Sequence, residues 1–312
     1  MLALSLDMGG SHIGCAVVRD RAILASSSLA SEGAGSLQSL LPGIEQELRR
    51  LLAESHANTA ECEGLAMGLP SVVDVRTGRI HSNFKKYEDA ATLELSGWCR
   101  ATFGVPLRME NDARMALLGE RYAGAAQGFD NVVMITLGTG IGGVAMILGR
   151  LLRGAHAQAA CLGGHLPVNF HGRPCVCGNI GCAEAEAGGW SLPGIAREWP
   201  GFAHSALARA PQIDFRTLFA AAADGDRVAV EVRQRCLEVW AANAVTLVNA
   251  YDPEIVVMGG GVMSSAAVII PFVQDHVTQH AWGAWGKPQV RAAALGNRAA
   301  LLGAVPLLQE VL

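Results

Sequence analysis

The first residues of this chain are repeated, as a pattern, near its middle. Residues 2–25, "LALSLDMGGSHIGCAVVRDRAILA", and residues 131–154, "NVVMITLGTGIGGVAMILGRLLRG", each contain three short apolar runs, with a glycine turn after the first run. Short apolar runs with tight connections predict an antiparallel β-meander. A repeat of this length therefore predicts two lobes, each of which opens with such a meander. One constant offset relates three pairs of residues: Gly9 and Gly138, Gly14 and Gly143, and Arg21 and Arg150.

The rest of the chain alternates strands with helices. Leucines at helical spacing predict a helix over residues 36–55, and a mainly helical stretch is predicted from 192 to 249. The segments "GLAMGLP", "PLRMEND" and "EIVVMGGG" are typical of strands, and "ARMALLGERYA" is typical of a helix. This pattern predicts an α/β fold. The length of 312 residues exceeds that of most single cores and favours two domains.

The two lobes are placed around the repeats. We predict an N-terminal lobe of residues 1–115, joined by a C-terminal helix at 297–312, and a C-terminal lobe of residues 116–296 that carries the cysteine loop "CVCGNIGC". Pro306 is expected to limit or kink the last helix, because proline lacks the N–H that a helix interior needs.

Charge and hydropathy argue against two classes of partner. A net charge of −4 offers no basic face for a nucleic acid or an anionic membrane. The sequence has no run of 18 apolar residues that would span a bilayer. The N-terminus "MLALSLDMGG" lacks the basic region of a signal peptide and is interpreted as a strand and a turn. We therefore expect a cytoplasmic protein, in which disulfides are disfavoured.

The two glycine turns are candidate phosphate sites. The segment "GTGIGG" matches the dinucleotide pattern, but that pattern requires a following helix and an acidic residue about 20 positions later. Here "VAMIL" follows, and no Asp or Glu occurs between Asp130 and Glu184, so we reject a dinucleotide site. Two turns in register instead offer backbone N–H groups to a polyphosphate held between the lobes. The residues concerned are Gly9, Gly10, Ser11, Gly138, Thr139 and Gly140. The alternative is that both turns are only tight hairpins.

Asp7 ends the first apolar run, just before the first glycine turn. A carboxylate beside a phosphate is repelled unless a divalent cation lies between them, which indicates Mg²⁺ held partly through water. The alternative is that Asp7 caps the turn.

"MENDAR" lies where a strand runs into a helix, and either Asp112 or Asn111 is suited to cap that helix. A carboxylate at a helix N-terminus is expected to stay ionised. Asp112 is therefore a candidate general base that accepts a proton from an attacking sugar hydroxyl, a role that Asp often takes in kinases. Asn111 would offer its amide to neighbouring hydroxyls.

Three thiols lie close together at Cys175, Cys177 and Cys182. Zinc needs four ligands in a structural site, so a histidine has to complete the set. His171 lies in the same loop, whereas His165 comes from the preceding "GGH" turn. We favour His165, because its use would tie that turn to the cysteine loop. The alternative is that the thiols are reduced and simply buried.

These segments together resemble one family, the bacterial ROK sugar kinases, and the resemblance covers nearly the whole chain. "DMGGSHIGCAVV" is similar to the first phosphate motif of the family, and "LGTGIGG" is similar to the second. "ENDA" resembles the segment with the catalytic Asp, and "DPEIVVMGGGV" resembles the strand and turn that border the adenosine. "CVCGNIGCAE" resembles the cysteine signature, which is the most specific of these motifs.

The resemblance implies a two-lobed actin-like ATPase (ribonuclease H-like) fold, with ATP and sugar in the cleft between the lobes. It implies Asp112 as the general base, Gly260 and Gly261 near the nucleotide, and a homodimer. The implied sugar contacts are Asn83, Asn111, Asp112, His165 and Glu184. The implied structural zinc has His165, Cys175, Cys177 and Cys182 as ligands, and the second ring nitrogen of the histidine is left for a sugar hydroxyl.

The chain departs from the family pattern at three places. The family has A-G-E-x-G-H before the cysteines, and its Glu contacts the sugar. Here the segment is "AACLGGH", so Cys161 or Leu162 stands in place of that Glu. Neither side chain accepts two hydroxyl hydrogen bonds, which argues against a glucokinase-like specificity. In addition, Ser11 replaces the usual Thr of the first phosphate motif. In the segment "NFKKY", the residues after Asn83 replace the usual apolar residues and proline.

We expect an ATP-dependent kinase that phosphorylates a hydroxyl of a hexose or a hexose derivative, with Mg²⁺, ATP and a structural zinc. A sugar-responsive regulator shares the fold but needs a DNA-binding extension before the first strand, where this chain begins. A catalytically degenerate relative that binds sugar or nucleotide is supported only by the missing Glu. The retention of Asp7 and Asp112 argues against it. Trp282 and Trp285 offer apolar surface for the expected dimer, although an interior location explains them equally well.

Overall fold

The computed structural model describes the whole chain apart from residues 10–11, 32–35, 82–86, 160, 285 and 311–312. The chain forms two compact units. One consists of Met1–Gly128, Arg153–Cys161 and Ala294–Leu312, and the other consists of Phe129–Leu152 and Leu162–Ala293. The predicted boundary between residues 115 and 116 falls within helix α3 (Asp112–Ala123), which lies wholly in the first unit.

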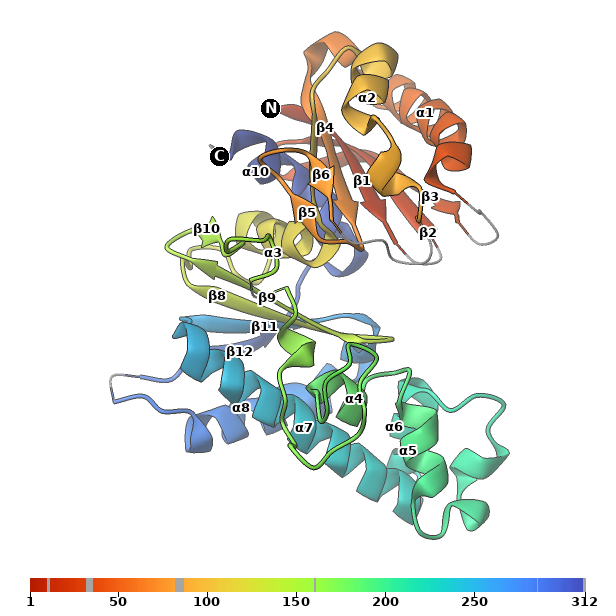
Figure 1. The fold of residues 1–312 in the computed structure, drawn as a ribbon, viewed down its shortest axis with the longest axis vertical. Helices are drawn as coiled ribbons and strands as arrows, with labels where there is room; N and C mark the ends of the chain where they lie inside the picture. The colour runs from red at the N-terminus through yellow and green to blue at the C-terminus, as the bar shows by residue number, and fades with distance from the viewer. Residues whose placement is uncertain (10–11, 32–35, 82–86, 160, 285, 311–312) are drawn as a thin grey trace. The chain divides into compact units, whose positions relative to one another are not determined.

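The first unit is built on a five-stranded sheet in the order β3-β2-β1-β4-β7 (Figure 1). Its strands are β1 (Leu2–Met8), β2 (His12–Arg19), β3 (Ala22–Ala30), β4 (Cys62–Leu69) and β7 (Leu107–Asn111). The first three strands form the predicted antiparallel meander, and β4 and β7 run parallel to β1. The carboxyl ends of β1, β4 and β7 therefore lie at the same edge of the sheet.

Helices α1 (Leu37–Glu54) and α2 (Leu95–Phe103) pack on this sheet in one hydrophobic core. The helix predicted over residues 36–55 is confirmed: the side chain of Ser36 caps α1, and the buried residues recur at helical spacing. These buried residues are Leu37, Ile44, Leu48, Leu51 and Leu52. A small hairpin, β5 (Val73–Asp74) and β6 (Arg79–Ile80), completes the unit.

The C-terminal helix predicted at 297–312 is divided. The structure has α9 (Ala299–Leu302) and α10 (Ala304–Gln309), separated at Gly303 and not at Pro306. A Cβ at Gly303 would lie 2.0 Å from the carbonyl oxygen of Met115, so α3 packs directly on this backbone. Pro306 lies in the first turn of α10, where an N–H has no partner within the helix.

The second unit repeats the plan of the first, with a sheet in the order β10-β9-β8-β11-β12 (Figure 1). Its strands are β8 (Val132–Leu137), β9 (Ile141–Ile147), β10 (Arg150–Leu151), β11 (Ile255–Gly259) and β12 (Gln289–Ala292). The antiparallel meander of β8, β9 and β10 is confirmed, and β11 runs parallel to β8. The repeat read in the sequence is thus a repeat of sheet topology.

The helices of the second unit are α4 (Ala183–Ala187), α5 (Leu192–Glu198), α6 (Phe215–Ala223), α7 (Arg227–Tyr251) and α8 (Ala266–His280). The helical stretch predicted from 192 to 249 therefore contains three helices. Trp240 of α7 is fully buried and packs against Phe215 and Phe219 of α6. Helix α7 ends at Asp252, which has a positive φ and precedes Pro253.

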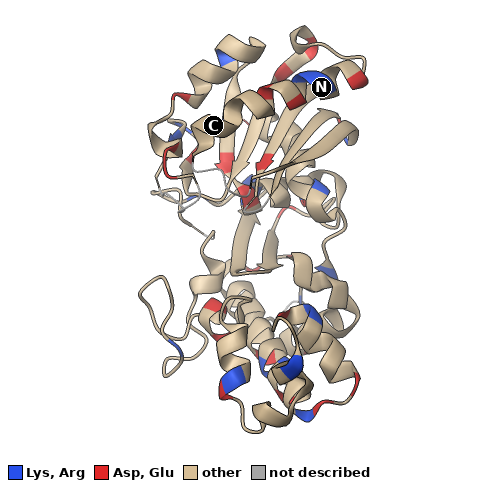
Figure 2. Ribbon diagram, turned by 90° about the vertical axis from the view of Figure 1, so that its right-hand side faces the viewer, with Lys and Arg blue, Asp and Glu red and all other residues tan. Residues whose placement is uncertain are grey.

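Short 3₁₀-helices connect these elements. They are η1 (Thr59–Glu61), η2 (Ala90–Thr92), η3 (Gly163–His165), η4 (Phe202–His204), η5 (Ala206–Arg209), η6 (Gly261–Ser265) and η7 (Gly296–Arg298). Basic and acidic residues are interspersed along the described chain in both units (Figure 2). Within the described ranges, none of the helices combines the length and the apolar character that a bilayer span requires.

We predict that alanine has opposite effects at two helical glycines. At Gly119, a Cβ would lie 1.9 Å from the carbonyl oxygen of Ala299, so Gly119→Ala should force α3 and α9 apart. Overpacking of this kind typically costs about 1–3 kcal/mol. At Gly43 in α1, a Cβ would have no neighbour within 4 Å, and Gly43→Ala should stabilise by roughly 0.5–1 kcal/mol. Urea unfolding of both variants measures the difference, and equal effects would contradict the packing described.

Candidate functional site

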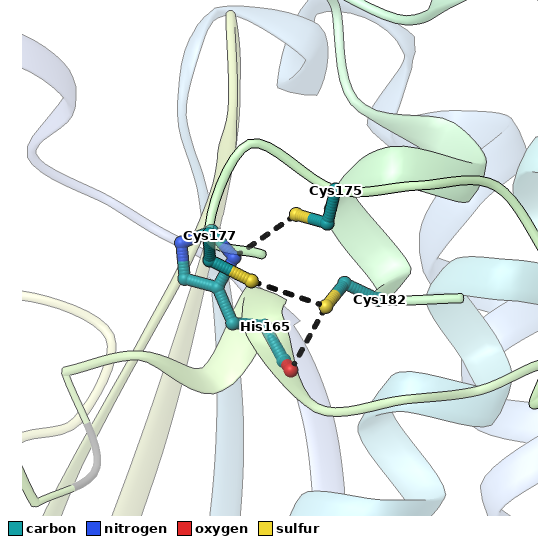
Figure 3. A group of neighbouring side chains, drawn as sticks. All are labelled: His165, Cys175, Cys177 and Cys182. Carbon is teal, nitrogen blue, oxygen red and sulfur yellow. Dashed lines mark hydrogen bonds between the residues drawn. The ribbon is translucent and has the colours of Figure 1, made fainter. Parts of the chain in front are cut away.

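Three cysteines and a histidine converge in the second unit. His165 ends η3, Cys175 and Cys177 lie in the loop that follows, and Cys182 immediately precedes α4. Their ligand atoms all lie within 4.8 Å of one another (Figure 3). The Sγ atoms of Cys177 and Cys182 are 3.6 Å apart, and Nδ1 of His165 is 3.5 Å from Sγ of Cys175. The sequence prediction of this four-residue cluster is confirmed.

The donor set and its spacing fit zinc. A tetrahedral zinc with Zn–S bonds of about 2.3 Å places two ligand sulfurs about 3.8 Å apart, close to the separation of Cys177 and Cys182. The cluster contains His165 and not His171, whose ring stacks on Phe170 with a centroid distance of 4.1 Å. Four protein ligands leave no open position for chemistry, so a zinc held here is structural.

The loop around these ligands has little hydrophobic core of its own. Among the described residues between Leu152 and Cys182, only η3 is regular structure, and the buried cluster at the site consists of Cys175, Cys182 and Ala185. The buried carboxylate of Glu186 accepts a hydrogen bond from the backbone N–H of Arg173. A metal that joins four points of such a loop supplies stability that packing does not provide.

Two carboxylates meet at the carboxyl edge of the first sheet. Asp7 lies near the end of β1, and Asp112 follows β7 as the first residue of α3. Strand β4 runs between these strands, with Gly68 paired to Asp7 on one side and to Glu110 on the other. A Cβ at Gly68 would lie 3.7 Å from Oδ1 of Asp7 and 3.5 Å from Cα of Asp112. Both aspartates therefore border Gly68 in the middle of this sheet edge.

Burial governs the ionisation of this pair. It raises the pKa of Asp7 from 3.8 to about 7, with a further contribution from the charge of Asp112. Burial also raises the pKa of Asp112 to about 6, against the opposing effects of hydrogen bonds from Ala113 N–H and the Asn111 amide. Desolvation therefore outweighs the hydrogen bonds at the helix N-terminus and raises the pKa of Asp112, but a carboxylate with a pKa of about 6 is still ionised at neutral pH.

Asn111, and not Asp112, caps α3. Its Oδ1 accepts from the backbone N–H of Arg114 at 3.2 Å. Its Nδ2 donates to Oδ1 of Asp112 at 2.9 Å, and that same oxygen accepts from Ala113 N–H at 2.7 Å. These two hydrogen bonds fix the orientation of the Asp112 carboxylate. Because Asn111 is the N-cap, the carboxylate does not have to accept the capping hydrogen bond.

A buried ionic network supports this region and was not foreseen from the sequence. Glu110 and Arg114 are completely buried and form an ion pair with each other. The carboxylate of Glu110 also accepts a hydrogen bond from Nε of Arg153 at 2.8 Å. Arg114 donates to the backbone carbonyls of Ala157 at 2.9 Å and Ala159 at 2.7 Å. The network therefore links the first turn of α3 to the segment before the metal loop. Glu110 lies in β7 and Arg114 in the first turn of α3, and charged residues are rarely fully buried, so the sequence carried no signal of this pair.

The second glycine turn connects β8 to β9. Gly138 N–H donates to the carbonyl of Gly140, and Trp190 N–H donates to the carbonyl of Thr139 at 2.9 Å. Gly260 follows β11 with a φ of +94°, and a Cβ there would lie 2.2 Å from the carbonyl of Leu137. Gly260 therefore packs against the residue that opens the turn, and only glycine allows that approach. This region unites two of the predicted phosphate segments, Gly138–Thr139–Gly140 and Gly260–Gly261.

A pocket of about 460 Å³ opens beside this turn. Its walls are mainly apolar or aromatic, with one arginine and one aspartate. The lining residues are Gly138, Thr139, Gly189, Trp190, Pro193, Arg197, Pro211, Gln212, Ile213, Asp214 and Phe215. Sequence reasoning identified Gly138 and Thr139 but not the other walls. Those walls come from residues 189–197 and from residues 211–215, which lead into α6, and no local motif marks the two segments as related.

The other predicted site residues are placed as follows. Gly9 accepts a hydrogen bond from the Tyr87 hydroxyl at 2.9 Å, and a Cβ at this glycine would lie 2.7 Å from the carbonyl of His12. Glu184 lies in α4, where its carboxylate accepts hydrogen bonds from Ile141 N–H and Trp190 Nε1. Gly10, Ser11 and Asn83 lie outside the described residues.

Comparison with known proteins identifies the family. The profile of the ROK family matches residues 3–311. This chain is a member of the ROK family. It is 32% identical over 279 residues to a glucokinase of Thermotoga maritima, with 86% of each chain covered. Transcriptional repressors among the relatives are more distant, at 24% identity.

Solved ROK structures match the whole fold. A ROK hexokinase from Thermus thermophilus superposes with a TM-score of 0.80 at 28% identity, covering 98% of this chain and 97% of its own. A ROK family glucokinase from Streptomyces griseus, in complex with glucose and AMPPNP, superposes with a TM-score of 0.75 at 29% identity, covering 98% of this chain and 99% of its own. The predicted two-lobed actin-like ATPase fold is thereby confirmed.

Either Cys161 or Leu162 stands where the ROK resemblance leads us to expect a glutamate. The Cys161 thiol donates to the carbonyl of Gln158 at 3.3 Å, and burial raises the pKa of this thiol. Leu162 is 45% exposed, and its backbone forms an isolated β-bridge with Gly143. A Cβ added at Gly143 would lie 2.8 Å from Cα of Gly163. Neither side chain supplies a carboxylate, so the argument against a glucokinase-like specificity stays a prediction.

We predict that Asp7→Asn raises the free energy of unfolding, and that this gain grows with pH. The folded-state pKa of about 7 lies above the usual 3.8, so the folded protein holds this proton more tightly than the unfolded chain. The contribution of Asp7 to the free energy of unfolding is fully present below pH 4. It is lost as the pH rises through 7, and the loss is at most roughly 4 kcal/mol. Thermal melts without Mg²⁺ at pH 5 and pH 8 measure the gain. The exposed Asp275→Asn is the control, and a loss of stability at both pH values would contradict the analysis.

We predict one zinc ion per chain, bound by the cluster. Cys182→Ser should abolish zinc retention and lower the melting temperature, because three ligands no longer close a tetrahedral site. Metal analysis of the dialysed protein by mass spectrometry measures the content. Cys236→Ser replaces a buried cysteine of α7 outside the cluster and should keep the zinc. A zinc-free native protein, or full zinc in Cys182→Ser, would rule out this site.

Proposed function

We propose that this protein is an ATP-dependent kinase that transfers the γ-phosphoryl group of ATP to a hydroxyl of a hexose or hexose derivative. The observation that carries the proposal is the buried pair Asp7 and Asp112 at one sheet edge, in a chain of the ROK family. Phosphoryl transfer requires mainly positioning, charge neutralisation and a group that accepts the proton of the attacking hydroxyl.

Asp112 is the proposed general base. Its hydrogen bonds with Asn111 and Ala113 both go to Oδ1, so Oδ2 is the oxygen assigned to the substrate proton. With a pKa of about 6, this carboxylate is ionised at neutral pH and yet basic enough to accept a proton. The hydroxyl oxygen attacks the γ-phosphorus, its proton passes to Asp112, and the bond to the bridging oxygen breaks to release ADP.

Asp7 is the residue proposed to bind Mg²⁺, partly through water. Among the described residues, no basic side chain forms an ion pair with this buried carboxylate, so a divalent cation fits its charge. Mg²⁺, when bound, neutralises charge between the triphosphate and the carboxylate. The backbone N–H groups of the turns at Gly9–Gly10–Ser11 and Gly138–Thr139–Gly140 are proposed to hold the phosphates.

The pocket beside Gly138 and Thr139 is proposed to hold the nucleoside. Its aromatic and apolar walls, including Trp190 and Phe215, suit a planar base, and its volume of about 460 Å³ lies in the range of small-molecule sites. Gly260 and Gly261 are proposed to lie near the nucleotide, because they adjoin the same turn.

The proposed sugar contacts are Asn83, Asn111, Asp112, His165 and Glu184. His165 turns Nδ1 toward Cys175, so Nε2 is the nitrogen available to a hydroxyl. Several relatives are named glucokinases, which makes glucose the first sugar to test. The missing carboxylate at Cys161 and Leu162 favours a different hexose or an N-acylhexosamine. The homodimer also stays a prediction; Trp282, with 91% of its side chain exposed, offers it apolar surface.

We predict ADP release from Mg-ATP with one member of a panel of hexoses and N-acylhexosamines. Asp112→Asn should lower kcat by about 10²–10⁴-fold, because it removes the proton acceptor while keeping the shape of the side chain. The exposed Asp275→Asn should keep wild-type activity. A coupled assay for ADP measures both variants.

Two results would contradict the proposal. Silence of the zinc-loaded, ATP-binding protein across the panel would favour a catalytically degenerate relative or a sugar-responsive regulator. Full activity of Asp112→Asn would remove that residue from catalysis and require another base.

A further inference from the structure

Asn243 places a buried amide among apolar residues of α7. The residue is 1% exposed, and the other buried residues of this helix are apolar side chains and one cysteine. Its Nδ2 donates to the backbone carbonyl of Gly163 at 2.9 Å, whereas Oδ1 accepts no hydrogen bond from any residue that the structure describes. Burying an amide with an unsatisfied oxygen costs stability. The hydrogen bond to Gly163 is therefore the one contact that explains an asparagine at this place.

Gly163 begins η3, and the candidate metal ligand His165 ends it. The backbone of η3 lies directly on β9. A Cβ at Gly163 would lie 2.8 Å from Cα of Gly143, and a Cβ at Gly164 would overlap the carbonyl oxygen of Ile141. This short helix is thus packed on β9 and hydrogen-bonded to α7. Because Gly163 precedes His165 by only two residues, these contacts restrict where the imidazole can lie.

A second buried polar contact joins α7 to the cysteine loop. Nη2 of Arg235 donates to Oε2 of Glu186, whose side chain is 1% exposed. The other oxygen of Glu186 accepts from the backbone N–H of Arg173. A Cβ at Gly172 would overlap that same oxygen, so the loop backbone lies directly on the carboxylate. Arg173 precedes the candidate ligand Cys175 by two residues, and its position fixes the entry to the cysteine loop.

Both contacts start from one helix. Helix α7 packs against α4 and against η3 (Figure 1). Asn243 and Arg235 lie about two helical turns apart. Between them, Nε1 of Trp240 donates at 3.0 Å to the carbonyl of Ala187, the last residue of α4. Helix α7 therefore contacts the backbone before the histidine ligand, the loop before the first cysteine ligand and the helix after the last one.

We propose that Asn243 and the pair of Arg235 and Glu186 are positioning residues for the metal site. They hold the backbone next to the ligands near the arrangement that the metal requires. Less of the loop then has to be ordered when zinc binds, and zinc is released more slowly. Glu186 acts on the loop and is distinct from Glu184, which stays among the proposed sugar contacts.

The inference reaches the substrate through one residue. His165 is both a candidate metal ligand and a proposed sugar contact, so Asn243 also sets where Nε2 of His165 meets a sugar hydroxyl. This part of the inference rests on the proposed function and deepens it. The part that concerns the metal does not depend on catalysis.

The first experiment measures the rate of zinc release from the zinc-loaded protein into an excess of a coloured chelator. Asn243→Leu has a similar size and removes the donor to Gly163. It should speed release about tenfold, which is a typical effect of losing a group that orients a metal ligand. Gln234→Leu is the matched control. It removes an exposed amide of the same helix, which donates to Glu238, and should leave the rate unchanged.

The second contact is tested in the same assay. Arg235→Met removes the cation that holds Glu186 and should also speed release about tenfold, whereas Arg235→Lys keeps a cation and should restore most of the wild-type rate. Arg227→Met breaks an exposed ion pair of α7 with Glu231 and is the control. Melting temperatures of the zinc-loaded variants separate a loosened site from general unfolding. If Arg235→Met does not fold, the comparison of Asn243→Leu with Gln234→Leu carries the test.

The second readout is the substrate. In Asn243→Leu the KM for the sugar should rise severalfold while the Kd for AMPPNP stays unchanged, because the displaced group is His165 and not the nucleotide pocket. An unchanged rate of zinc release in Asn243→Leu, or an equal acceleration in Gln234→Leu, would overturn the inference.

The remaining outcomes separate this inference from the proposed function. Faster zinc release with an unchanged sugar KM would confirm the anchoring by α7 and remove His165 from the proposed sugar contacts. A wild type that binds AMPPNP but phosphorylates no sugar would refute the proposed kinase. The zinc measurement needs no sugar, so it would still test the anchoring.

Discussion

The four candidate metal ligands, one histidine and three cysteines, come together in the long irregular segment that precedes α4. Between Leu152 and Cys182 the described chain has almost no regular structure, and its own buried cluster has three small members. Hydrophobic burial on that scale does not order a loop against its conformational entropy. A metal bound by His165 and the three cysteines supplies such a constraint directly beside α4, because Cys182 is the residue that precedes this helix.

The first unit differs from the cysteine loop in that it buries charged groups, and burial disfavours their ionised forms. Asp7 and Asp112 both border Gly68 and have raised pKa values, and the completely buried Glu110 and Arg114 lie close to Asp112 in the chain, in β7 and the first turn of α3. Groups of this kind cost stability unless they are paired, and the aspartates lack a pairing cation within the described chain. Such a conflict between stability and local charge is typical of catalytic sites, where the substrate or its metal ion supplies the compensation.

Local patterns predicted the elements of this fold well, because each element is encoded by a short stretch. The alternation and glycine turns of the two repeats predicted the meanders, and the leucine spacing with Ser36 predicted α1. Local patterns failed where a distant backbone intervenes. The last helix is divided at Gly303, where the backbone lies against Met115 of α3, and the pattern around Pro306 carries no trace of that contact. The fully buried pairing of Glu110 with Arg114 was missed for the same reason.

The sequence by itself determined the chemistry available to this protein: three thiols and a histidine at zinc-binding spacing, two aspartates at strand ends and two glycine turns in register. Residue type and spacing along the chain are enough for that, since ligand preference and turn formation are local properties. Only the tertiary structure decided which groups meet. It selected His165 over His171, assigned the helix cap to Asn111, and turned Glu184 toward Ile141 and Trp190. These choices depend on which segments pack together, and packing is a property of the whole fold.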